Sequence, residues 1–165
     1  MIRETVVRLA KKTDLEEIME IYNQGIEDRI ATLETEKKDL SYMAKWFEQH
    51  NGRYCVLTAE EEGQVIGWAS LNPYSSRSAY DGVADLSIYI SRAFRGKGAG
   101  EKLLSALELK ARENKFHKLV LFTFPFNGLG QSLYKKLGFR EVGIFQNQGV
   151  LDGEFVDVMA MEKLL

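Results

Sequence analysis

The segment RGKGAG, residues 95–100, places glycines and two cations between a predicted strand and a predicted helix. Glycine allows the backbone to approach a ligand closely and to adopt positive φ angles. The first amides of a helix have no intrahelical partners, and the helix dipole adds partial positive charge there. Because Arg95 and Lys97 would add full charges, the segment predicts an anion-binding loop. The alternative is a solvated basic turn that precedes a helix.

Two common nucleotide-binding motifs do not fit this loop. A P-loop requires GxxxxGK[ST], whereas Gly100 is followed by Glu101. A dinucleotide fold requires GxGxxG after a first strand and an acidic residue about twenty residues later, and neither the spacing nor the position agrees. The pattern R-x-x-G-x-G therefore defines an anion site whose ligand the loop alone does not identify.

A strand at residues 82–90 and a helix from about residue 98 to 114 must position this loop. Alternation in the strand gives two faces, one with Val83, Asp85, Ser87 and Tyr89 and the other with Ala84, Leu86, Ile88 and Ile90. Asp85 lies four residues before Tyr89, or roughly 13 Å at about 3.3 Å per residue.

The other apolar patterns predict six more strands and three more helices. The strands are expected at residues 5–10, 54–59, 65–72, 117–123, 140–146 and 154–162. The helices are expected after a capping box of Thr13 and Glu16, around residues 40–47 and at residues 128–137. Strands and helices alternate only in the second half, so we expect an α/β (α+β) domain over residues 1–165. Its mixed sheet would have about seven strands, flanked by about four helices.

Six further blocks resemble the GNAT acetyltransferase superfamily, and within it the phosphinothricin and methionine sulfone or sulfoximine N-acetyltransferases. They are IYNQGI (21–26), ATLETE (31–36), NPYSSRSAYDG (72–82), DLSIYIS (85–91), FNGLGQSLYKKLGF (126–139) and DGEFVDV (152–158). The resemblance implies the GNAT fold, in which two splayed parallel strands hold acetyl-CoA. It also implies direct transfer of the acetyl group to the α-amine of a small amino-acid-like substrate.

The resemblance implies a coenzyme site in which the loop holds the pyrophosphate and the pantetheine arm follows the preceding strand. An extended pantetheine arm is of similar length to the distance from Tyr89 to Asp85, so the thioester would end near Asp85. The implied coenzyme residues are Ile88, Tyr89, Ile90, Arg95, Gly96, Lys97, Gly98, Ala99, Gly100, Asn127 and Tyr134. The Ile88 amide is the expected oxyanion donor. Asn127 is also a natural helix N-cap, and Gly130 stands where many relatives have serine.

Asp85 and Tyr134 are the catalytic residues that the resemblance implies. Asp85, which stands where the subgroup usually has glutamate, would accept the amine proton, and its shorter side chain favours a bridging water. The alternative is that Asp85 orders the strand or binds the substrate ammonium. Tyr134 would protonate the leaving thiolate, since a phenol of pKa about 10 can donate to a thiolate whose acid has a pKa of about 8.5. The alternative is a core tyrosine with its hydroxyl at the edge.

The resemblance places the substrate beside Arg77, which would bind its carboxylate, with Tyr80, Thr32, Glu34 and Asp85 lining the pocket. The alternative is that Arg77 and Tyr80 belong to a polar surface loop. Two other functions stay open: acetylation of another amine (a polyamine, a peptide or a protein N-terminus), and a non-catalytic acetyl-CoA-binding module.

Composition excludes several other classes. The chain has 165 residues, 45% hydrophobic and 28% charged, with a net charge of −2. No basic field exists for nucleic acid or a membrane surface, and no signal peptide or membrane span is expected, which predicts a cytoplasmic location. The single Cys55 is expected to be a small buried residue, and His50 and His117 to be surface or edge residues rather than metal ligands. Subgroup members are commonly homodimers, and this expectation is carried over.

Overall fold

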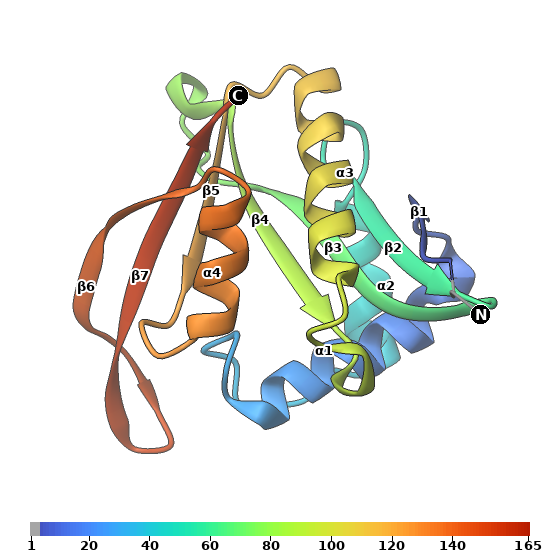
Figure 1. Ribbon diagram of the computed structural model, residues 1–165, viewed down its shortest axis with the longest axis horizontal. Coiled ribbons are helices and arrows are strands. Elements are labelled where there is room, and N and C mark those ends of the chain that lie inside the picture. Colours follow the sequence, from blue (N-terminus) through green and yellow to red (C-terminus); the bar gives the residue numbers. More distant parts are fainter. Residues whose placement is uncertain (1–3) are drawn as a thin grey trace.

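The central element of the computed structural model, which describes residues 4–165, is a seven-stranded sheet in the order β1-β2-β3-β4-β5-β7-β6 (Figure 1). Its strands are β1 (Val6–Leu9), β2 (Val56–Glu61), β3 (Gln64–Pro73), β4 (Val83–Ile90), β5 (Lys118–Thr123), β6 (Arg140–Leu151) and β7 (Glu154–Leu164). Of the neighbouring strand pairs in this sheet, β4–β5 is parallel and the other five are antiparallel. The predicted mixed sheet of about seven strands is confirmed. Residues 1–3 of the expected domain lie outside the described residues.

Four α-helices cover the two faces of the sheet (Figure 1). They are α1 (Leu15–Asp28), α2 (Leu40–Gln49), α3 (Ala99–Glu113) and α4 (Gly128–Lys136). Helices α1 and α2 pack on one face, where Ile18 and Met43 surround Trp68 of β3. Helices α3 and α4 cover the other face, where Leu103 and Tyr134 join the larger apolar core. The alternation expected for β4 follows from this arrangement, because its two faces contact different cores.

The parallel pair β4 and β5 separates after a short contact. Their register joins Val83–Asp85 with Lys118–Val120. Beyond these residues both strands continue, but they no longer pair with each other. Backbone groups that face the gap therefore have no partner strand on that side. This separation confirms the splayed parallel strands that the family resemblance implied, and Asp85 lies at the last paired position.

Two predicted element boundaries were wrong. Helix α1 does not begin with a Thr13–Glu16 capping box, because its N-cap residue is Asp14. The Asp14 carboxylate accepts hydrogen bonds from the Arg8 guanidinium at 2.8 and 3.0 Å and from the Lys11 N–H at 2.7 Å. An ion pair between β1 and the residue before α1, which the capping-box pattern does not reveal, therefore organises this helix start. Strand β6 extends to Leu151 instead of ending at residue 146, since an irregularity between Phe145 and Gly149 interrupts its register without ending it.

Candidate active site

Three adjoining hollows occupy the region where β4 and β5 separate. We call them the central cavity (about 140 Å³), the loop groove (about 460 Å³) and the outer hollow (about 170 Å³). The central cavity is lined by Ala31, Asp85, Leu86, Ser87, Ile88, Tyr89, Leu121, Phe122, Thr123, Asn127 and Tyr134. It shares Ala31, Ile88, Tyr89, Asn127 and Tyr134 with the loop groove, and Ala31, Phe122 and Thr123 with the outer hollow. The shared residues make one path from the glycine loop through the cavity to the outer hollow.

The glycine loop forms one end of the groove. Gly96 and Gly98 have φ angles of 75° and 94°, values that favour glycine, and a Cβ on either would meet no atom within 4 Å. Helix α3 begins directly after Gly98, so its first amides have no intrahelical acceptors. Gly96, Gly98 and Gly100 all line the groove. These features provide backbone donors and a helix N-terminus in an open site, as an anion requires.

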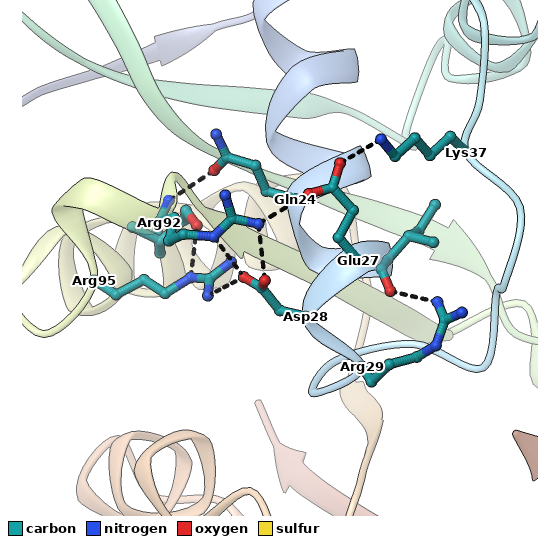
Figure 2. A network of polar contacts seen from close by, with 9 residues as sticks. Gln24, Glu27, Asp28, Arg29, Lys37, Arg92 and Arg95 are labelled. Atoms are coloured by element: carbon teal, nitrogen blue, oxygen red, sulfur yellow. Dashed lines mark hydrogen bonds and ion pairs between the residues drawn. The ribbon is translucent and has the colours of Figure 1, made fainter. Parts of the chain in front are cut away.

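Arg95 lines the groove, but its charge is already paired (Figure 2). Its Nη1 donates to the Asp28 carboxylate at 2.6 Å, and its Nε donates to the Ile90 carbonyl at 3.2 Å. Arg92 donates to the same Asp28 carboxylate at 2.8 Å, and these hydrogen bonds hold the pKa of Asp28 below its usual range. Figure 2 shows the two guanidinium groups converging on Asp28 at the end of α1. The loop therefore presents a partly neutralised arginine beside its backbone donors.

The predicted loop residues Lys97 and Ala99 do not line the groove. The Lys97 ammonium lies 5.7 Å from the centroid of the Phe94 ring, and Ala99 is the buried first residue of α3. Of the remaining predicted coenzyme residues, Ile88, Tyr89, Ile90, Asn127 and Tyr134 all line the groove.

Within residues 4–165, Asp85 is the one carboxylate that lines the central cavity. Burial raises its pKa to about 6, an effect that a hydrogen bond from Asn72 partly opposes. The Asn72 Nδ2 lies 3.5 Å from Asp85 Oδ2 and 3.0 Å from Ser87 Oγ. A carboxylate of this pKa is ionised at neutral pH and is a stronger base than an ordinary aspartate. The site thus offers a proton acceptor where the two strands separate.

Tyr134 stands where the central cavity meets the loop groove. Its side chain is almost fully buried, and burial raises its pKa to about 12. Its ring contacts Phe139 edge-on, with 6.1 Å between the centroids. The phenol is neutral at physiological pH, so it can donate a hydrogen bond or a proton to an atom in this position.

Asn127 has the predicted N-cap role at α4. Its Oδ1 accepts from the Gly130 N–H at 3.1 Å, and its Nδ2 donates to Thr123 Oγ1 at 3.3 Å. A Cβ at position 130 would lie only 2.6 Å from Asn127 Nδ2. Gly130 therefore leaves room for the capping side chain.

Tyr89 contributes mainly to the opposite face of the sheet. Its ring stacks on Trp68 with centroids 4.9 Å apart and lies 5.1 Å from that of Tyr22. Gly25 makes room for it, since a Cβ there would lie 2.8 Å from the ring. Burial raises the Tyr89 pKa to about 12. The Tyr89 side chain therefore belongs mainly to the core between the sheet and helices α1 and α2.

The predicted substrate residues are only partly brought together. Thr32 lines the outer hollow, and Asp85 lines the central cavity. Among the residues that line the three hollows, Glu34, Arg77 and Tyr80 do not occur. Glu34 instead pairs with Lys38 at 2.9 Å, and Tyr80 packs edge-on against Tyr74. The roles of Arg77 and Tyr80 stay predictions.

Several residues that line the central cavity were not predicted from the sequence. Ser87 shares a strand face with Asp85, and alternation alone could have indicated it. Phe122, Thr123 and Ala31 could not be found this way, because they reach the cavity from β5 and from the segment after α1. Within residues 4–165, no three His, Cys, Asp or Glu side chains are grouped to hold a metal ion. No helix in that range has the length and apolar character needed to cross a membrane.

Comparison with known proteins identifies the family. Residues 15–139 match the Acetyltransferase (GNAT) family. The chain belongs to this family. The resemblance expected from the sequence is thereby confirmed.

Individual relatives match this chain over nearly its whole length. The L-methionine sulfoximine/L-methionine sulfone acetyltransferase of Salmonella typhimurium is 32% identical over 94% of this chain and 92% of its own. A crystal structure of a GNAT superfamily phosphinothricin acetyltransferase from Sinorhizobium meliloti, in complex with AcCoA, is 31% identical. Its TM-score is 0.93, and the match covers 98% of this chain and 88% of that one. A ribosomal-protein-alanine N-acetyltransferase structure from Brucella melitensis is 34% identical, with a TM-score of 0.94 and coverage of 97% and 99%.

Proposed function

We propose that this GNAT protein transfers the acetyl group of acetyl-CoA directly to the α-amine of a small amino-acid-like substrate of the methionine sulfone, methionine sulfoximine or phosphinothricin type. One observation carries the proposal: a half-buried carboxylate and a buried phenol, Asp85 and Tyr134, line one cavity that continues into a groove ending at the glycine loop. The relatives named for these substrates and the AcCoA complex support it.

The coenzyme would lie along the loop groove. The amides after Gly98 would hold its pyrophosphate, and Asn127 would contact the pantetheine arm. Arg95 would add its charge to the phosphates at the expense of its ion pair with Asp28. Ile88 lies beyond the part of β4 that pairs with β5, so its backbone is the proposed oxyanion donor.

The transfer requires two protons to leave the substrate nitrogen, which begins as an ammonium and ends as an amide, and one proton to reach the sulfur. Asp85, through a water molecule, takes the first proton from the substrate ammonium and passes it to solvent, and the free amine attacks the thioester carbon. A C–N bond forms, the nitrogen of the tetrahedral intermediate loses its second proton to the same water and Asp85, the C–S bond breaks, and Tyr134 donates its proton to the departing thiolate. The phenolate regains a proton from solvent or from Asp85, so the net reaction releases one proton. A runner-up function, binding acetyl-CoA without turnover, would leave Asp85 and Tyr134 without a role.

The outer hollow would receive the substrate side chain. It is lined by uncharged residues, namely Ala31, Thr32, Leu33, Phe122, Thr123, Phe124 and Val158. No Lys, Arg or His of residues 4–165 lines this hollow or the central cavity. An anionic group there would lose its water without gaining a cation. The lining therefore favours an uncharged side chain, such as that of methionine sulfone, over the phosphinate of phosphinothricin.

Arg77 remains our proposal for the residue that binds the substrate carboxylate, with Tyr80 beside it. Arg77→Ala should raise KM for a carboxylated substrate and leave coenzyme affinity unchanged. An equal loss of coenzyme binding would contradict this assignment.

We also propose a single catalytic domain over residues 1–165, a cytoplasmic location and a homodimer. The free thiol of the single Cys55 agrees with a reducing compartment. Strand β6 lies at the edge of the sheet and exposes apolar side chains, including Ile144, Phe145 and Val150. Such an edge is suited to contact with a second copy.

A thiol-release assay with acetyl-CoA tests the substrate class, using methionine sulfone, phosphinothricin, spermidine and an alanine-terminated peptide. We expect kcat/KM for methionine sulfone to exceed that for phosphinothricin by about tenfold or more. Leu33→Lys, which places a cation in the wall of the outer hollow, should narrow this ratio about three- to fivefold. Leu109→Lys, on the exposed side of α3, is the matched control. A higher rate with the peptide or spermidine would favour the alternative substrates.

A further inference from the structure

His50 is placed differently from the surface or edge position expected for it. It is half-buried at the C-terminal end of α2, and both ring nitrogens have partners. Nδ1 lies 2.8 Å from the Trp46 carbonyl oxygen, and Nε2 lies 2.8 Å from Asn72 Oδ1. The ring also packs against the Trp46 indole, with 4.6 Å between centroids. The side chain is therefore held in one position, with its Nε2 directed at an amide.

That amide lies between His50 and the carboxylate of the cavity. Asn72 of β3 stands directly opposite Asp85 of β4 in the antiparallel register. Its Oδ1 accepts from Ser70 Oγ at 2.9 Å on the side that faces His50. Its Nδ2 donates to Ser87 Oγ at 3.0 Å and lies 3.5 Å from Asp85 Oδ2. One side chain thus connects the imidazole with the proposed base.

The direction of the amide determines which form of Asp85 it stabilises. The Trp46 carbonyl can only accept, so His50 Nδ1 carries a proton. When Nε2 carries a proton as well, the imidazolium donates to Asn72 Oδ1, and the amide NH₂ group faces Asp85 and stabilises the carboxylate. If Nε2 had no proton, the favourable amide direction would be reversed. The carbonyl would then face Asp85 and stabilise the protonated acid. The proton on Nε2 and the charge on Asp85 are therefore linked through one amide.

We propose that His50 is a positioning residue for the acetyl transfer: by donating its Nε2 proton to Asn72, it keeps the amide NH₂ directed at Asp85 and keeps this carboxylate ionised. The inference rests on the proposed function. The other ionisable groups of residues 4–165 that line the cavity are the phenols of Tyr89 and Tyr134. Both are neutral, since burial raises each pKa to about 12. The fixed backbone N–H of Leu86 also donates to Asp85, so the polar side chain that can change the Asp85 charge is Asn72.

The test follows the Asp85 carboxyl carbon by ¹³C NMR during a pH titration of the coenzyme-free protein, together with the pH profile of kcat/KM. His50→Phe keeps an aromatic ring against Trp46 but removes the Nε2 donor. We expect the midpoint of the Asp85 titration and the acid limb of the kcat/KM profile to move upward by about 0.5 to 1 pH unit. This corresponds to a three- to tenfold change in the proton affinity of Asp85. His50→Gln, whose amide can donate from the place of Nε2, should restore the wild-type profile. His117→Phe, at an exposed histidine outside this chain of contacts, is the matched control.

A double-mutant cycle separates a positioning role from a packing role. Asn72→Leu should cause a similar upward shift, and His50→Phe should add nothing in that background. An unchanged Asp85 titration in His50→Phe, or additive shifts in the double variant, would overturn the inference. Absence of acetyl transfer to any amine would instead count against the proposed function, because the NMR titration needs no substrate.

Discussion

At the scale of single residues, Asp85 combines a proposed catalytic role with a cost to stability. Its folded-state pKa of about 6 lies above the ordinary value of 3.8 because burial disfavours the charged form. A raised carboxyl pKa means that the contribution to stability is fully present below pH 3.8 and is lost as the pH rises through 6. At neutral pH, the ionised side chain therefore destabilises the fold.

Asp85→Asn should accordingly stabilise the protein at pH 7.5 by up to about 3 kcal/mol, since the pKa difference is about two units. At pH 4 the variant and the wild type should be nearly equal in stability. Urea unfolding at both pH values measures the difference. Asp81→Asn, in the exposed loop before β4, is the control, and a loss of stability at pH 7.5 in Asp85→Asn would contradict the burial argument.

Tyr134 is the second residue whose removal has a defined expectation. Tyr134→Phe keeps the ring in contact with Phe139 and removes only the proton donor. We expect kcat to fall by about 10- to 100-fold with little change in KM, because the lost interaction forms with the departing sulfur. Steady-state kinetics with varied amine concentration measures this. An unchanged kcat would exclude the role as an acid.

The identities of Asp85 and Tyr134 could be predicted because their motifs resemble those of a known family. Their altered pKa values could not, since these depend on burial by segments far away in the sequence. Likewise, alternation placed Asp85 and Ser87 on one face, but only the β3–β4 register brings Asn72 opposite Asp85.

At the scale of elements, the start of α4 depends on a glycine at position 130, where any side chain would contact Asn127. Gly130 leaves the space that Asn127 uses to cap the helix and to line the cavity. Gly130→Ser should displace the Asn127 side chain, lower stability by about 1 kcal/mol and weaken coenzyme binding. Gly128→Ala is the control, because a Cβ there would meet no atom within 4 Å. Thermal unfolding and calorimetric titration with CoA measure both effects, and a Gly130→Ser variant that behaves like the control would refute the steric explanation.

Local patterns predicted the existence of the elements better than their ends. Seven strands and four helices were found near their expected places, because the spacing of apolar residues within each segment indicates its secondary structure. The start of α1 was misplaced because Arg8 and Asp14, from different elements, form an ion pair. The end of β6 was misplaced because QNQG resembles a turn, whereas pairing with β7 continues to Leu151.

At the scale of the whole molecule, the long edge strand β6 underlies the proposed homodimer. Phe145 is 48% exposed and Val150 57% exposed on this edge. Phe145→Glu should shift sedimentation from a dimer toward a monomer, because a buried charge at an interface has no partner. Leu109→Glu, on the exposed side of α3, should leave the dimer intact. A wild-type monomer at micromolar concentration would contradict the proposal.

The central claim is acetyl transfer to an amine in the cavity between β4 and β5. It is tested most directly by mass spectrometry of methionine sulfone incubated with acetyl-CoA and the wild-type protein or the Asp85→Asn, Tyr134→Phe double variant. We predict N-acetylated methionine sulfone and an equal amount of free CoA with the wild type, and strongly reduced product with the double variant. Product formed equally by both proteins would contradict the assignment of the site. Tight coenzyme binding with no acetylated product from any amine tested would contradict the enzymatic function.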